Sequence, residues 1–283
     1  MEKIDAIIQK IQDDPESTDI RLVELNLWKR IREKAIQGRR TGLGITAEGD
    51  MLAALGFRYG SDEAIDFAVE IQKTLALTAY RSSCIMAKER GPFPIFDAKR
   101  EIGNPLLSRI MREDEALYND IQRYGRRNIS MLTIAPTGTT SIMTQTTSGI
   151  EPVFLPFYKR RRKVNPNDKD VKIAFTDQNG DAFEEYYVFH HKLITWLENN
   201  QYDVEKVRNS SVEEIEKIVE KSPFHKATAN DVDWLSKVKM QGMIQKWVDH
   251  SISVTVNLPN DISEEMVAKV YQTAWESGCK GIT

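Results

Sequence analysis

The chain has 283 residues, a formal net charge of −3, 41% hydrophobic residues and 29% charged residues, values typical of a globular protein with one large or two smaller domains. No apolar run can span a bilayer and the N-terminus does not resemble a signal peptide, which argues against a membrane or secreted protein. The two cysteines are too few for a disulfide framework or a metal cluster and favour a cytoplasmic protein, while the slightly acidic charge argues against direct nucleic-acid binding.

Helices are predicted over most of the first 125 residues, because apolar side chains recur there at helical spacing. Ser61 is a candidate N-cap for the longest of these helices, and Cys84 lies on its apolar face. Three prolines and two glycines predict a loop at 91–105. The predicted helices cover most of residues 1–38, 46–56, 61–90 and 106–124.

An apolar strand is predicted at 126–135, followed by a turn rich in hydroxyl side chains. Pro136 has no amide hydrogen and ends the strand, and Gly138 permits backbone angles that a side chain would forbid. Consecutive free amides beside hydroxyls bind anions, more strongly where a helix begins, so the turn predicts a phosphate site. The candidate site residues are Ala135, Pro136, Thr137, Gly138, Thr139, Thr140 and Ser141.

An ordinary turn is the alternative interpretation, since turns use the same residues for conformation alone. The turn is not a P-loop, because no lysine follows the glycine at the required spacing. Glu151 lies between a turn and Pro152 and is expected to anchor this loop rather than to act chemically.

The C-terminal half begins with a polar segment. Residues 159–182 predict an exposed strand or hairpin, in which the basic run 159–163 forms a solvated face, and residues 183–221 predict charged helices. Asn230 or Asp231 is expected to cap a helix that contains Trp234.

Residues 251–258 alternate strictly between polar and apolar side chains and predict a strand. Asp261 and Glu264 form a predicted capping box for the next helix. The repeated order of helix and strand favours an α/β fold, with a parallel-stranded barrel as one form of it. The polar face of 251–258 suits either a barrel lumen that holds a polar ligand or a wet edge strand.

Five stretches together resemble the large catalytic chain of ribonucleotide reductase. The most specific is the turn at 135–142 with Ser148–Phe154 after it. The motif sequences most resemble those of the adenosylcobalamin-dependent class II enzymes. The other four are Arg40–Gly56, Glu89–Asp97, Lys239–Pro259 and Gly278–Thr283.

The resemblance implies a ten-stranded α/β barrel and a reaction that replaces the 2′-hydroxyl of a ribonucleoside di- or triphosphate with hydrogen. It implies a cysteine thiyl radical, adenosylcobalamin as its generator and an external dithiol as reductant, while the loop 135–141 holds the substrate phosphates. The family's radical cysteine lies in an Asn-x-Cys-x-Glu loop upstream of the phosphate loop, and this motif is absent here.

Residues 1–283 are therefore expected to be a C-terminal portion of the catalytic barrel, with a variable polar segment at 159–225. We expect no catalytic residue and no metal site in it, a structural role for Cys84 and Cys279, and a complementary N-terminal reductase chain as partner. The alternatives are a class I reductase with a di-metal radical, a different phosphate-binding barrel enzyme, and a non-catalytic nucleotide-binding module.

Overall fold

The computed structural model describes residues 1–165, 167–168 and 171–283, which form two compact units. The first unit comprises Met1–Gly44, Glu70–Thr133 and Lys246–Ser251. The second comprises Ile45–Val69, Ile134–Gln245 and Ile252–Thr283. Helix α4 (Asp62–Arg90) contributes residues to both units.

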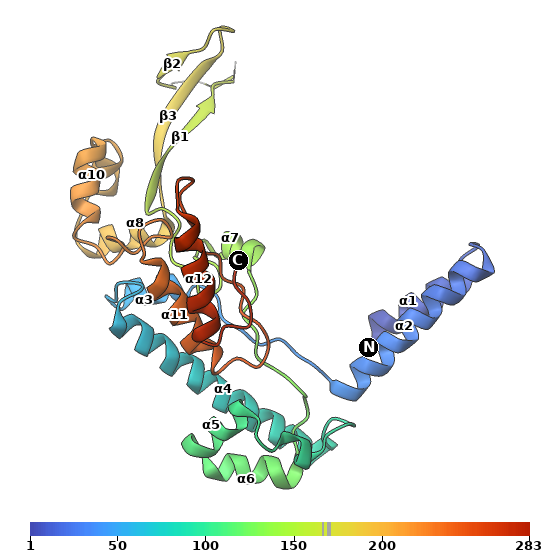
Figure 1. The fold of residues 1–283 in the computed structure, drawn as a ribbon. Helices are drawn as coiled ribbons and strands as arrows, with labels where there is room; N and C mark the ends of the chain where they lie inside the picture. The colour runs from blue at the N-terminus through green and yellow to red at the C-terminus, as the bar shows by residue number, and fades with distance from the viewer. Residues whose placement is uncertain (166, 169–170) are drawn as a thin grey trace. The chain divides into compact units, whose positions relative to one another are not determined.

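The first unit is mainly helical. Helices α1 (Glu2–Asp13) and α2 (Thr18–Gly38) pack against each other as a hairpin (Figure 1). After the 3-10 turn η1 (Ala98–Glu101), helices α5 (Pro105–Glu113) and α6 (Glu115–Tyr124) form a second pair. The side chains of Asn104 and Asp114 cap these two helices by accepting amide hydrogens of their first turns.

Extended backbone joins the helices of the first unit. Leu43 and Leu132 form an isolated parallel bridge, and the His250 amide donates to the Leu132 carbonyl on the other side at 2.9 Å. The Asp249 carboxylate accepts the amides of Met131 and Leu132 at 2.8 and 2.7 Å, and it also accepts from the buried Tyr80 hydroxyl. A side chain thus supplies acceptors that a regular sheet would take from a neighbouring strand.

The second unit contains the sheet and the remaining helices. Its three strands are antiparallel in the order β1-β3-β2, and β1 runs from Phe157 opposite Phe189 to Lys163 opposite Phe183 (Figure 1). The elements are α3 (Glu48–Ala54), α7 (Gly138–Thr144), β1 (Phe157–Lys163), β2 (Phe175–Thr176), β3 (Ala182–Phe189), α8 (His191–Asn199), α9 (Val204–Arg208), α10 (Val212–Val219), α11 (Trp234–Gln245) and α12 (Glu264–Glu276).

Two hydrophobic clusters hold this unit together. The larger one joins α3, β3 and α8 to α10 through residues that include Phe189, Leu193 and Ile215. The smaller one packs α11 against α12 through Val238, Val270 and Ala274. Burial of these apolar side chains is the main favourable term in the stability of the unit.

The predicted helices of the first 125 residues are confirmed, and so are the N-cap at Ser61 and the exposed hairpin region. Residues 183–189 were predicted as helix, which is wrong: they belong to β3, where acidic side chains face the basic strand β1. Arg161 pairs with Glu185 at 2.8 Å and Arg162 with Glu184 at 2.5 Å. The basic run therefore finds its counter-charges on the neighbouring strand.

Two predicted caps are also wrong. The Asp233 carboxylate, rather than Asn230 or Asp231, accepts the Ser236 amide at the start of α11. Ser263, rather than Asp261 with Glu264, caps α12 by accepting the Met266 amide. In each case a residue of equal capping strength lies nearer to the first helical turn.

The segments 126–135 and 251–258 are extended but do not form regular strands. Ile134 and Ile252 make an isolated parallel bridge, and Val256 donates to the Thr283 carbonyl at 2.8 Å. A regular strand requires a continuous ladder of partners, and among the described residues these segments have only isolated bridges and scattered backbone hydrogen bonds. The fold is thus mixed helix and sheet, and the described residues alone form no ten-stranded barrel. None of the described helices combines the length and apolarity needed to cross a membrane.

Candidate functional site

The predicted phosphate loop lies at the start of α7 in the second unit. Ala135 and Pro136 are exposed, and so are Gly138 to Thr140 at the N-terminus of the helix. The first amides of an α-helix have no acceptor within the helix, so this end offers hydrogen-bond donors to solvent or to an anion. Thr137 precedes the helix in a left-handed conformation, with φ 50° and ψ 26°.

The hydroxyls of the loop divide into two groups. Thr137 Oγ1 accepts the Gly149 amide at 2.8 Å and lies 3.0 Å from Thr46 Oγ1. Ser141 is buried, and its hydroxyl donates to the Gly138 carbonyl at 2.8 Å. Thr137 thus ties the loop to neighbouring segments and Ser141 braces it internally, whereas Thr139 and Thr140 are exposed to solvent.

The backbone conformation of the loop does not require a glycine at position 138. Gly138 lies in helical conformation and does not use the angles that glycine permits and a side chain would forbid. A Cβ atom built on Gly138 would meet no heavy atom within 4 Å. The fold would tolerate a side chain here, and the open space in front of the amides is free for a ligand.

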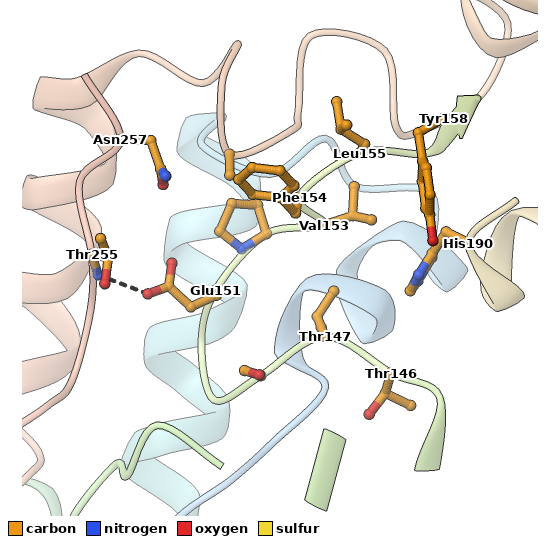
Figure 2. Close-up of a pocket in the computed structure, with 13 residues that line it drawn as sticks. Thr146, Thr147, Glu151, Val153, Phe154, Leu155, Tyr158, His190, Thr255 and Asn257 are labelled. Carbon is orange, nitrogen blue, oxygen red and sulfur yellow. Dashed lines mark hydrogen bonds between the residues drawn. The ribbon is translucent and has the colours of Figure 1, made fainter. Parts of the chain in front are cut away.

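A cavity of about 470 Å³ lies beside the loop in the same unit (Figure 2). None of Ala135 to Ser141 lines it, but Ser148 does, and the Ser148 hydroxyl is 2.7 Å from that of Ser141. Its volume falls within the range of small-molecule sites. The lining residues are Thr146, Thr147, Ser148, Glu151, Pro152, Val153, Phe154, Leu155, Tyr158, His190, Ala229, Thr255 and Asn257.

Glu151, which was predicted to anchor the loop, makes its side-chain contacts in one wall of this cavity. Its Oε1 accepts the Thr255 amide at 2.7 Å, the interaction drawn in Figure 2. Its Oε2 lies 2.6 Å from Nζ of Lys237, whose side chain is buried in α11 and also donates to the Thr255 carbonyl. A buried ammonium group needs such partners, because its desolvation is otherwise costly.

Asp50 and His190 form a second polar contact that sequence reasoning missed. His190 Nε2 lies 2.6 Å from Asp50 Oδ1, and Asp50 Oδ2 accepts the Thr147 amide at 2.9 Å. The two residues are far apart in sequence, and no motif spacing relates them. The adjacent pair His190 and His191 was a visible signal, but it identifies no partner.

Glu48 is the most unusual carboxyl group of the second unit. It is 1% exposed, and neither of its oxygens has a hydrogen-bond partner among the described residues. Burial raises the pKa of Glu48 to about 8. Burial also raises the pKa of the nearby Tyr59 hydroxyl, with further contributions from the charges of Glu48 and Glu151.

The two cysteines have the environments of structural thiols. Cys84 is buried in α4, and Cys279 is half-buried with its thiol 3.8 Å from the Val238 carbonyl. Burial raises the pKa of both thiols and so disfavours the reactive thiolate. Across the described ranges, no group of three or more His, Cys, Asp or Glu side chains is placed to hold a metal ion.

Comparison with solved structures identifies the class of fold. The chain is similar to the Actinobacillus ureae class Id ribonucleotide reductase alpha subunit, with a TM-score of 0.61 and 19% sequence identity. The match covers 98% of this chain and 43% of that chain. At this identity the similarity shows the fold alone.

The ribonucleotide reductase barrel-domain family matches residues 20–283, and the chain belongs to this family. The chain is 29% identical over 257 residues to a vitamin B12-dependent ribonucleoside-diphosphate reductase of Mycobacterium tuberculosis, covering 90% of this chain and 32% of the relative. A protein of the same name from Thermoplasma acidophilum is 28% identical, with 90% and 29% covered. The ribonucleoside-diphosphate reductase subunit alpha of Chlamydia pneumoniae is 26% identical, with 92% and 26% covered. The chain thus spans about a third or less of the length of these relatives.

Proposed function

We propose that this chain is a C-terminal portion of the catalytic barrel of a ribonucleotide reductase, and that Ala135–Ser141 hold the substrate phosphates. One observation carries the proposal: the N-terminus of α7 is exposed, and it begins at a glycine that the fold itself does not require. A close approach of a ligand to the backbone explains that glycine. Membership of the reductase family supports ribonucleotides as the ligands.

The reaction that we propose converts a ribonucleoside di- or triphosphate into its deoxyribonucleotide. The 2′-hydroxyl leaves as water, a hydrogen takes its place, and two thiols are oxidised to a disulfide, so atoms and electrons balance. The radical cysteine belongs to a complementary N-terminal segment, and an external dithiol restores the reduced pair. The buried position of Cys84, the half-buried position of Cys279 and the raised pKa of both thiols support their exclusion from this chemistry.

Adenosylcobalamin is the proposed cofactor, because several relatives are named vitamin B12-dependent. When bound, it would supply the radical that starts the reaction. The cavity beside the loop has about 470 Å³, and a corrinoid with its nucleotide is larger than such a site. We therefore assign no residue of this chain to the cofactor and place its binding with the complementary segment.

Calorimetric titration with ADP and with adenosine tests the phosphate site. Gly138→Val places a branched side chain in front of the amides, and we expect it to weaken ADP binding about tenfold or more, which corresponds to about 1.4 kcal/mol. Gly281→Val is the matched control, because a Cβ there also meets nothing within 4 Å. Equal ADP affinity of Gly138→Val and the unaltered chain would show that the site lies elsewhere.

A class I reductase is the second candidate, since other relatives are named ribonucleoside-diphosphate reductase subunit alpha, without vitamin B12 in the name. Reconstitution separates the two. The chain combined with its complementary segment, a dithiol and a ribonucleotide should yield deoxyribonucleotide only when adenosylcobalamin is added. Turnover that needs a second metal-containing subunit instead would favour class I.

A further inference from the structure

We infer that Thr46 and Asp50 are positioning residues for the phosphate loop, because they hold Thr137 in the left-handed conformation from which α7 starts. The inference rests on the proposed function of the loop and deepens it. Neither residue lies in the loop itself. Thr46 lies in the segment that leads into α3 and Asp50 in the first turn of α3, about ninety residues earlier in the chain.

The conformation of Thr137 needs an explanation. Its φ of 50° lies in the left-handed region, which a β-branched residue rarely adopts without support from its surroundings. Thr137 makes no side-chain cap to the helix that it precedes. Its hydroxyl instead contacts the Thr46 hydroxyl and the Gly149 amide, which hold the residue in place.

Three hydroxyl contacts form a consistent chain around Thr137. Thr46 donates its hydroxyl hydrogen to the Thr147 carbonyl at 3.2 Å and can then accept that of Thr137 at 3.0 Å. Thr137 in turn accepts the Gly149 amide at 2.8 Å. Each donor has one acceptor, so the left-handed residue is held from two neighbouring segments.

Asp50 fixes the segment on which this chain depends. Its carboxylate accepts the Thr147 amide at 2.9 Å, and its own amide donates to Thr147 Oγ1 at 3.2 Å. The Ala47 amide also donates to the Thr147 carbonyl at 3.1 Å, so Thr147 is held through its amide, its carbonyl and its hydroxyl. Asp50 is 5% exposed, which shields these bonds from competition with water.

The same network reaches the cavity beside the loop. His190, which lies 2.6 Å from the second oxygen of Asp50, lines the cavity together with Thr147 and Ser148. The polar contacts thus continue from the cavity wall through Asp50, Thr147 and Thr46 to Thr137. The loop geometry is set by residues outside the loop, and this is the role that we assign to them.

Thr46→Val and Thr46→Ser form the central test, since valine matches the shape of threonine and serine keeps its hydroxyl. We expect Thr46→Val to weaken ADP binding about tenfold, to leave the weak binding of adenosine unchanged and to shift the melting temperature little. Thr46→Ser should restore the affinity for ADP. Without any ligand, hydrogen exchange of the Gly149 amide should become faster in Thr46→Val, because Thr137 no longer stays in place to accept it.

A double-variant comparison separates positioning from general stability. Glycine adopts left-handed angles freely, so in the Thr137→Gly background the change Thr46→Val should have no further effect on ADP affinity. An equal loss in both backgrounds, or unchanged exchange of the Gly149 amide in Thr46→Val, would overturn the inference.

If Gly138→Val weakens ADP binding but Thr46→Val does not, the inference fails while the phosphate site stands. If Gly138→Val has no effect, the proposed site fails, and the exchange measurement still decides the role of Thr46.

Discussion

Glu48 shows how strongly burial alone can raise the pKa of a carboxyl group. Glu48 is enclosed at the start of α3 with no partner for either oxygen among the described residues, and burial raises its pKa to about 8 from the ordinary 4.5. Between these two pH values the folded chain keeps a proton that the unfolded chain has released. Folding stability contributed by this group is therefore present below pH 4.5 and is lost as the pH rises through 8.

Glu48→Gln removes this proton linkage. We expect the variant to match the unaltered chain at pH 5 and to be more stable at pH 8, by up to about 4 kcal/mol, because keeping the proton on folded Glu48 costs about 1.4 kcal/mol for each pH unit between the two pKa values. Urea unfolding at the two pH values measures the difference. Glu216→Gln is the control on an exposed face of α10 and should change stability little at either pH. A Glu48→Gln variant that is no more stable at pH 8 would show that the carboxyl group finds a partner or solvent.

At the scale of elements, one buried ion pair connects helix α11 to the extended segment 251–258. Lys237 Nζ lies 2.6 Å from both Glu151 Oε2 and the Thr255 carbonyl. Lys237 is 1% exposed, so its charge depends on these partners. The pair also orders the wall of the cavity that Glu151 and Thr255 line.

Lys237→Met leaves Glu151 without its counter-charge, and we expect a loss of about 3–5 kcal/mol in stability. The double variant Lys237→Met with Glu151→Gln should regain part of this loss, because no uncompensated charge remains. Chemical denaturation of the four proteins of this cycle measures the coupling. Simple addition of the two single losses would contradict a direct interaction.

Helices were the elements that sequence reasoning predicted best, because each carries its own periodic pattern. The run from Ser61 to Arg90 needs no distant partner to be recognised. The extended segments were predicted as strands and are not regular, since a strand depends on partners that the pattern does not name. Residues 183–189 were misassigned for the same reason: their acidic side chains suit a helix surface until β1 supplies the opposing charges.

Part of the candidate site could be predicted from the sequence, and part of it could not. The residue types of Thr137–Ser141 predicted an anion-binding turn, and the structure adds that α7 begins in this turn. The residues that brace it, Thr46 and Asp50, could not be predicted, because their contacts join segments about ninety residues apart. The assignment of 135–141 to phosphate stays a prediction.

For the whole molecule, we predict that the chain alone self-associates. Large apolar side chains are exposed, including Val23, Ile102 and Met143 at 71%, 74% and 80%, and exposed apolar surface favours association. Sedimentation velocity should show oligomers that increase with concentration. Co-expression with the complementary N-terminal segment should give a defined complex instead. A monomer that melts cooperatively at every concentration would contradict this prediction.

Helix α12 carries Trp275 with 81% of its surface exposed, and Trp247 in the first unit is 6% exposed. An indole in water emits at longer wavelengths than one surrounded by apolar groups. The chain therefore contains its own optical reporter: any polypeptide that covers this side of α12 should shift the emission to the blue. Replacing Trp275 with phenylalanine would remove this shift in emission and leave the loop unchanged. Assembly can therefore be followed by fluorescence before any turnover is measured.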